Sequence, residues 1–342
     1  MEFHRKNHFV PQNYLKRWSL DGKRIWGYRL LVSNPNVPEW NTYSIRGLAC
    51  REHLYTRLSP NGEETDEIER WLDREFEAPA EEAIHKATTN CRLKPDDWVK
   101  LILFTAAQFV RTPAQLEKTM KKWQIEMPDL LNTVLKNTVQ KLEKSVEPGK
   151  QFKSTYDYDN ENLPVRVSRQ PSLDQNKDLL KVETIIGRAW WLFGVKHILT
   201  KTAKVLLMHK WSIIHPTNLE WITSDDPVIC LNYYKKGSYD FGGGWGRKGS
   251  EIIFPISPNH MLYTMVGKKK SPRIDFSPEI SAELQKIIAE HAYRWIFSKE
   301  PNEKVESFRK RHVDNSAFKY EIESWKKWSK EQSKDERSFM KN

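Results

Sequence analysis

Hydrophobic residues recur every three or four positions through the middle of the chain, which is the spacing of an amphipathic helix. The stretch from Leu101 to Ala107 is apolar on nearly every side, and this pattern predicts a helix buried in the core. Helices are expected in four segments: from Glu64 onward, 93–113, 114–145 with an interruption near Met127-Pro128, and 178–200.

The pattern changes after residue 200, where short apolar runs are separated by turn residues. Four runs, AKVLLMHKWSIIHP, LEWITSDDPVICL, SEIIFPISP and HMLYTMVG, predict strands of an antiparallel sheet. A further strand is expected at 23–31, after the Asp21-Gly22 turn, and residues 1–20 are expected to be extended and then briefly helical. Residues 147–177 are interpreted as a polar connector, and the last forty residues as a charged helix.

Helices followed by strands and then by a helix are typical of an α+β fold. We expect a helical middle region, about 64–200, packed with a mostly antiparallel sheet formed largely by residues 203–298. Together these parts would make a single domain over 1–298, with 299–342 as a charged C-terminal helical extension.

The 342 residues carry a net charge of +11, which favours polyanionic partners. Nucleic acid is therefore an expected partner, and a partner protein is the alternative. Basic residues gather in 1–60, whereas 63–82 is strongly acidic. The glycine-rich segment FGGGWGRKG (241–249) is interpreted as a mobile hairpin tip. Phosphate contacts are expected from Lys6, Lys16, Arg17, Arg247 and Lys248.

The three cysteines, Cys50, Cys91 and Cys230, are odd in number and far apart, which disfavours a disulfide framework or a cysteine-built zinc site. No apolar run is long enough to span a bilayer, and no secretion signal is recognisable. The sequence thus predicts a cytoplasmic protein with no membrane partner.

The N-terminal stretch HFVPQNYL (8–15) sets hydrogen-bonding side chains beside a proline that restricts the backbone. His8 is held in this segment, and it can be a metal ligand, a proton carrier or a phosphate contact. The alternative is a histidine packed against the core with both nitrogens satisfied. We expect His8 to be catalytic, with Gln12 and Tyr14 beside it.

Two adjacent acids, Asp225 and Asp226, follow the predicted strand WITS. Carboxylates at a strand end can hold a divalent cation, so a Mg²⁺ or Mn²⁺ site with Asp225, Asp226 and His8 as ligands is one interpretation. The other is structural, because an Asp before Pro commonly forms a turn that caps backbone groups. We favour chemistry for Asp225 and the turn for Asp226.

Arg111 ends the apolar helix, with Gln108 one turn earlier on the same face. Its guanidinium either pairs with a buried carboxylate, for which Asp225 is the expected partner, or binds an anion. On the acidic helix, Glu69 or Glu75 could turn inward, although a charged run is usually a solvated face. His291 is a further candidate from the end of the chain.

Several of these segments together resemble the DUF4238 family of bacterial proteins. Residues 8–15 resemble its HxVPQxYL start, and four other pieces agree in order: EHLYT (52–56), Gln108 with RTP (111–113), ITSDDPV (222–228) and FPISP (254–258). The resemblance spans roughly residues 4–298 and points to a site, not to a reaction. Asp226 stands where the family pattern usually has Asn, which favours the turn because Asn would cap equally well.

Two classes of function follow from these observations. One is a nuclease or phosphodiesterase with His8 as proton carrier or ligand, Asp225 on a divalent ion and Arg111 stabilising charge on phosphorus. By analogy with bacterial families of this kind, such an enzyme would be a toxin or a phage-defence effector. The other is a non-catalytic module that binds nucleic acid or protein, in which the same three residues form a structural polar network.

Overall fold

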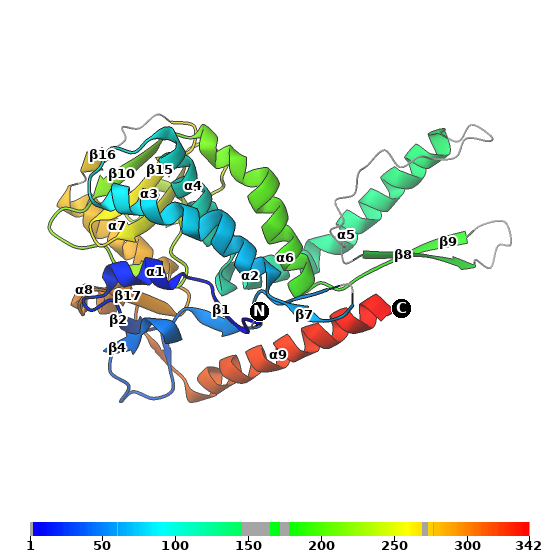
Figure 1. The fold of residues 1–342 in the computed structure, drawn as a ribbon, viewed down its shortest axis with the longest axis horizontal. Helices are drawn as coiled ribbons and strands as arrows, with labels where there is room; N and C mark the ends of the chain where they lie inside the picture. Colours follow the sequence, from blue (N-terminus) through cyan, green and yellow to red (C-terminus); the bar gives the residue numbers. More distant parts are fainter. Residues whose placement is uncertain are drawn as a thin grey trace.

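A six-stranded sheet forms the β-rich half of the molecule (Figure 1). The computed structural model describes residues 3–59, 61–145, 165–171, 178–268, 273–275 and 277–341. The strand order is β13-β12-β14-β15-β10-β16, antiparallel except for the parallel pair β10 and β16. Its strands are β10 (Trp211–His215), β12 (Ile229–Lys235), β13 (Ser238–Asp240), β14 (Ser250–Ser257), β15 (His260–Met265) and β16 (Arg273–Asp275).

A second sheet joins the beginning of the chain to its end. Its order is β11 (Thr223–Ser224), β17 (Trp295–Ser298), β2 (Arg24–Arg29) and β4 (Trp40–Ser44). Two-stranded pairs lie beside it: β1 (Lys6–His8) with β5 (Cys50–Glu52), β3 (Leu31–Val32) with β18 (His312–Val313), and β6 (Arg57–Leu58) with β7 (Glu64–Thr65). The β1–β5 ribbon places His8 opposite Cys50.

Helices cover these sheets and confirm the predicted α+β fold (Figure 1). They are α1 (Gln12–Leu15), α2 (Glu67–Leu72), α3 (Ala78–Thr88), α4 (Pro95–Val110), α5 (Pro113–Ser145), α6 (Arg188–His197), α7 (Pro278–His291), α8 (Glu303–Phe308) and α9 (Asn315–Lys341). A π-helical turn, Asp73–Glu77, joins α2 to α3, and another, Ile198–Thr202, follows α6. Short 3₁₀ segments are Lys16–Trp18, Ile45–Gly47 and Ala203–Met208.

The main core lies where α1 and α4 meet β14. Phe254 of β14 stacks on Tyr14 at 5.3 Å between ring centroids and contacts Phe104 of α4 at 5.7 Å. All three side chains are buried. Because apolar contact area is the main stabilising contribution in a core, this packing fixes the N-terminal segment against the sheet.

Three predicted elements differ in the structure. The predicted strand AKVLLMHKWSIIHP was wrong over residues 203–208, which form a 3₁₀ segment, and only Trp211–His215 is a strand. Residues 178–184 form β9 (Asp178–Thr184), paired with β8 (Val165–Pro171), so the predicted helix at 178–200 was wrong over its first half. Apolar and polar residues alternate in LKVET, which suits a strand, and α6 begins only after Gly187. The predicted interruption near Pro128 was also wrong, because α5 continues through this proline. Of the connector 147–177, residues 147–164 and 172–177 lie outside the described residues.

Candidate acid–base cleft

Arg111 follows the last turn of α4 and binds the N-terminal segment from within the core. Its Nη2 donates to the carbonyl of His8 at 2.6 Å, and its Nε donates to the carbonyl of Phe9 at 3.1 Å. Gln108 donates to the same Phe9 carbonyl at 2.7 Å. The buried backbone of the segment is thereby satisfied, and the direction in which His8 leaves it is fixed.

The carboxylate partner of Arg111 is Glu77, with which its Nη1 forms an ion pair. The predicted pairing of Arg111 with Asp225 was therefore wrong. Burial alone would lower the pKa of Arg111, but Glu77, Tyr55 and Glu69 together outweigh burial and keep the pKa above its ordinary value. A guanidinium that is 1% exposed and engaged on three sides acts as a structural fork, and it is not free to bind an anion.

His8 opens into a cleft on the surface of the domain. Its Nε2 lies 3.4 Å from the carbonyl of Arg46. A carbonyl can only accept, so Nε2 carries the proton and Nδ1 keeps its lone pair. Burial, helped by the nearby positive charge of Lys6, lowers the pKa of His8 below its ordinary value. The imidazole is therefore neutral at pH 7 and can accept a proton.

Glu69 on α2 enters the same cleft. Its Oε1 accepts from the backbone N–H of His8 at 3.3 Å, while its buried Oε2 has no hydrogen-bond partner within the described part of the chain. Burial raises the pKa of Glu69 to about 7. About half of the carboxyl groups are thus protonated at pH 7, which is the state needed for a proton donor.

The cleft has a volume of about 560 Å³. The N-terminal segment lines one wall with side chains that include His8, Gln12 and Lys16, and the helical segment lines the other with Glu69, Asp73, Glu77 and Glu81. These four acids are spaced by four residues, so they share one helix face, and the π-helical turn lies among them. Their spacing was the signal that sequence reasoning missed when it favoured a solvated acidic face. Glu75, off this face, pairs instead with Arg74.

Tyr14 lies inside the core, not in the cleft. Its fully buried hydroxyl donates to the carbonyl of Pro255 at 2.6 Å and accepts from Thr223 at 2.6 Å. Burial raises its pKa well above the ordinary value. Tyr14 therefore anchors α1 to β14 and β11, whereas Gln12 lines the cleft as expected of a site residue.

The predicted phosphate-binding residues of the N-terminal segment lie around the cleft. Lys6 Nζ donates to the carbonyl of Arg46 at 2.9 Å, the same carbonyl that His8 approaches. Lys16 donates to Asn13, and Arg17 pairs with Glu81 at 2.9 Å. Lys6 is thus an exposed cation that shares a hydrogen-bond acceptor with the His8 imidazole.

Asp225 lies in different surroundings from His8. Its carboxylate accepts from the backbone N–H groups of Tyr293 at 3.0 Å and Arg294 at 2.9 Å, which fixes the chain where it enters β17. Burial raises the pKa of Asp225 to about 7. The structure gives this carboxylate a capping role and gives His8 the partners Arg46, Glu69 and Arg111.

Asp226 makes a second buried group with Thr112 and His291. The Thr112 hydroxyl donates to Oδ1 at 2.8 Å, and the backbone N–H of Asp226 donates to Ser224 Oγ at 3.2 Å. The turn was predicted with the Asp226 side chain as the cap, whereas the side chain that accepts from backbone N–H groups is that of Asp225. His291 donates from Nδ1 to the Asp226 carbonyl at 3.0 Å. Burial raises the pKa of Asp226 to about 7 and lowers that of His291 to about 4.

The predicted metal ligands do not gather at one point. Within the described ranges, no group of three or more His, Cys, Asp or Glu side chains is arranged to hold a metal ion. Asp225 faces backbone amides, Asp226 faces Thr112, and His8 faces the cleft.

A family model described as a protein of unknown function, DUF4238, matches residues 6–302. The chain belongs to the DUF4238 family. No curated protein and no solved structure matches it. The DUF4238 match includes the cleft residues from His8 to Glu81 and ends before α9. Within the residues that the structure describes, no helix is both long and apolar enough to cross a membrane.

The glycine-rich segment of the DUF4238 region is packed against β12, in contrast to the predicted mobile tip. A Cβ on Gly243 would lie 2.6 Å from the backbone nitrogen of Leu231, so only glycine fits there. Arg247 and Lys248 are exposed at this end of β14, and neither lines the cleft.

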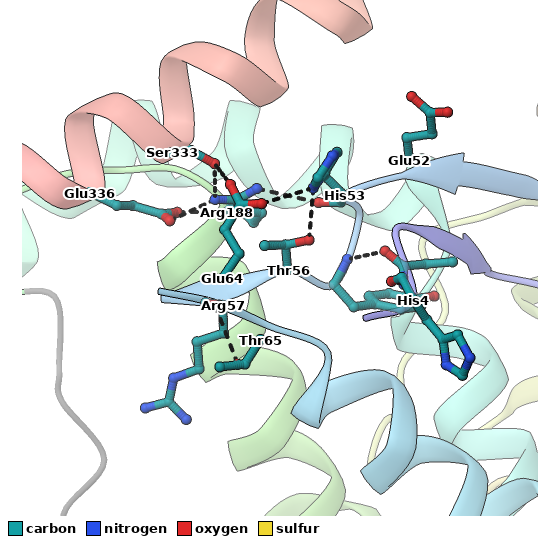
Figure 2. Close-up of polar contacts among 12 residues, drawn as sticks. His4, Glu52, His53, Thr56, Arg57, Glu64, Thr65, Arg188, Ser333 and Glu336 are labelled. Atoms are coloured by element: carbon teal, nitrogen blue, oxygen red, sulfur yellow. Dashed lines mark hydrogen bonds and ion pairs between the residues drawn. The ribbon is translucent and has the colours of Figure 1, made fainter. Parts of the chain in front are cut away.

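Beyond the DUF4238 match, α9 returns to the domain through a second polar cluster (Figure 2). Buried Arg188, at the start of α6, pairs with Glu336 at 2.7 Å and donates to Ser333 at 2.9 Å. Ser333 in turn donates to Glu64, which lies 3.6 Å from His53. His53 has a positive φ of 57°, and the cluster thus joins the EHLYT segment to the C-terminal helix.

Proposed function

We propose that the cleft is the active site of a ribonuclease that cleaves phosphodiester bonds by general acid–base catalysis. The observation that carries the proposal is the pairing of His8 with Glu69. Both open into one cleft, and burial pushes their pKa values in opposite directions, so the imidazole is neutral while the carboxyl group is protonated. Two groups set in this way are matched to accept and to donate a proton near pH 7.

RNA suits this pair because it carries its own nucleophile. His8 Nδ1 accepts the proton of a ribose 2′-hydroxyl as that oxygen forms a bond to phosphorus. The bond from phosphorus to the 5′ oxygen breaks, and the Glu69 carboxyl group donates its proton to the leaving oxygen. The products are a 2′,3′-cyclic phosphate and a free 5′-hydroxyl, with His8 protonated and Glu69 ionised until they exchange protons with water.

The charge of the chain supports a polyanionic substrate. The net charge is +11, and Lys6 shares the Arg46 carbonyl with His8. Lys6 therefore takes the phosphate-binding role first expected of Arg111, with Lys16 on the cleft wall as a second cation. Arg111 is a positioning residue that holds the backbone of His8.

Two other functions are kept as alternatives. A divalent ion could serve the same cleft, in which case cleavage would need Mg²⁺ or Mn²⁺ and would stop with a chelator. A non-catalytic module that binds nucleic acid or protein is favoured by one observation: Arg111 and Gln108 both donate to backbone carbonyls of the N-terminal segment, as a structural network requires. A cytoplasmic location and a role in phage defence belong to the proposal as well.

The test is cleavage of fluorescently labelled single-stranded RNA and of the matching DNA, with EDTA or with Mg²⁺. We expect RNA cleavage in EDTA and none of DNA. Glu69→Gln keeps the shape of the side chain but loses the ionisable proton, and His8→Gln loses the base; each should reduce cleavage about 10²-fold or more. Glu75→Gln, on the solvated face of the same helical segment, is the matched control. Absence of RNA cleavage by folded wild type under both conditions would falsify the proposal.

A further inference from the structure

A second pocket lies between α5 and α9, on the side of the ribbon away from the cleft. Its volume is about 350 Å³. Leu116 and Met120 of α5 form one wall, and Trp325 and Trp328 of α9 form the other. Concave sites of roughly 300–1,000 Å³ with apolar walls and a few polar groups are typical of small-ligand binding.

The tryptophan wall is ordered by contacts with the ribbon. The two indole rings lie 4.9 Å apart between centroids at 36°. Trp325 is anchored, because its indole N–H donates to the carbonyl of Glu52 at 3.1 Å and the guanidinium of Arg51 lies 4.5 Å from the centre of its ring. Trp328 is partly exposed and lines the pocket, so its ring can stack on a planar ligand.

The charges around the pocket favour a ligand with an anionic group. Glu321 is already engaged by Arg294 at 2.6 Å and by Arg51 at 3.5 Å, and Glu117 accepts from the hydroxyl of Tyr293. The three cations Arg51, Arg294 and Lys121 thus outnumber the two carboxylates by one positive charge. Lys121 lines the pocket at an exposed position, and together with Arg51 it provides positive charge at the mouth.

We propose that this pocket binds a nucleotide, with the base stacked on Trp328 and the phosphate facing Lys121 and Arg51. A planar ring with a phosphate matches both the aromatic wall and the positive mouth, and base–aromatic stacking tolerates any base. The nucleotide can be free or can be one unit of a single-stranded nucleic acid, because the recognised chemistry is the same.

The pocket is independent of the acid–base cleft. Arg51 pairs with Asn7 on the ribbon, next to the pair of His8 with Cys50. Side chains of successive residues leave a strand on opposite faces, so Arg51 points away from the face of His8. The binding does not rest on the chemistry proposed for His8 and Glu69, and α9, which supplies the tryptophans, lies beyond the matched residues 6–302.

The test is binding to the full chain of AMP, of a six-nucleotide 2′-O-methyl RNA that cannot be cleaved through its 2′ oxygen, and of inorganic phosphate. Calorimetry measures the first and last, and fluorescence anisotropy the labelled oligomer. We expect Trp328→Ala to weaken binding about tenfold, because stacking one base on an aromatic ring contributes about that much. Trp328→Phe should keep most of the affinity, and Lys121→Gln should weaken binding more than its neighbour Lys122→Gln.

The two ligands distinguish a free nucleotide from one unit of a single-stranded nucleic acid. Affinity for both AMP and the oligomer, reduced by Trp328→Ala, supports a free nucleotide as ligand, and affinity for the oligomer alone supports a unit of a chain. The proposal is overturned if wild type binds neither, if phosphate binds as tightly as AMP, or if folded Trp328→Ala binds both as wild type does. His8→Gln should lose cleavage and keep these binding affinities. Failure of the nucleotide-binding proposal is therefore distinguishable from failure of the ribonuclease proposal.

Discussion

Arg111 Nη2 donates to the backbone carbonyl of His8 at 2.6 Å, across 103 positions of the sequence. The contact joins the end of the buried helix α4 to the first strand of the chain. It means that the proposed base is positioned by the core, and that the segment preceding it is an ordered part of the domain. Because the bond goes to backbone, it orients His8 without using the imidazole.

Replacing Arg111 should destabilise the fold. Arg111→Gln leaves the His8 carbonyl and the Glu77 carboxylate without their donor, and the Phe9 carbonyl keeps only Gln108. Removing one partner of a buried ion pair typically costs about 3–5 kcal/mol. Urea unfolding of the variant should show a loss of that order in the free energy of unfolding.

The control for Arg111 is Arg74→Gln, because the Arg74 side chain is 71% exposed and its pair with Glu75 lies at the surface. Its free energy of unfolding should change by less than about 1 kcal/mol. Equal losses in both variants would show that the buried fork is not what holds the N-terminal segment.

The pH dependence of cleavage follows from the two cleft groups. Cleavage needs neutral His8, whose pKa lies below 6.5, and protonated Glu69, whose pKa is about 7. The rate should therefore rise with pH through the lowered pKa of His8 and fall above about pH 7. Initial rates on RNA from pH 4 to pH 9 measure this profile. In Asp73→Asn the alkaline limb should persist, and a rate that keeps rising above pH 8 would remove Glu69 from the acid role.

Tyr14→Phe should cost stability without changing the chemistry of the cleft. The variant leaves the Pro255 carbonyl and the Thr223 hydroxyl without the phenol, both inside the core. A buried polar group that loses its partner costs about 1–3 kcal/mol. Thermal unfolding should show the loss, with Tyr234→Phe, a residue 64% exposed, as the control. The pH profile of cleavage should keep both limbs, which a catalytic Tyr14 would not allow.

The sequence predicted the α+β fold because its two periodicities are strong. Apolar positions recur at helical spacing in α4, and β-branched and aromatic runs mark β10, β12, β14 and β15. The 178–184 strand was missed because a seven-residue run next to a real helix looks like that helix's first turns. Only the alternate positions of Leu180, Val182 and Thr184 favour a strand over a helix in this segment.

The site was predicted in part, because the direction of a side chain depends on contacts that spacing does not contain. His8 and Gln12 line the cleft, as their place beside Pro11 suggested. Arg111 pairs with Glu77 and not with Asp225. The sequence has a carboxylate at both positions, and spacing along the chain does not show which of them contacts Arg111. Glu69 was only a weaker candidate beside Glu75, because an acidic helix face is usually solvated, and burial of Glu69 beside β1 is a tertiary contact that the sequence does not show.

Asp226→Asn should stabilise the protein at alkaline pH. Asn keeps an oxygen that accepts from Thr112, and it removes a carboxylate whose pKa burial raises from 3.8 to about 7. A raised pKa means that the folded state binds the proton more tightly than the unfolded chain, so this carboxylate costs stability as pH rises through that range. The gain of the variant should grow as pH rises from about 4 to about 7 and level off above that, so it should be larger at pH 8 than at pH 5 by more than about 1 kcal/mol, since each pKa unit corresponds to about 1.4 kcal/mol.

Unfolding of both proteins in urea at pH 5, 6, 7 and 8 measures that gain. His291, whose pKa is lowered to about 4, gives the opposite slope between pH 4 and 6.5, but it is present in both proteins and largely cancels. Asp225→Asn is the contrasting variant. Its amide oxygen can take the place of Oδ1 and accept from Tyr293 and Arg294, but its NH2 group at the place of Oδ2 would face the Arg294 N–H without bonding, so the variant should lose about 1–3 kcal/mol. If Asp226→Asn instead loses stability at every pH, the Asp226 carboxylate makes a contact that an amide cannot replace, and the turn interpretation fails.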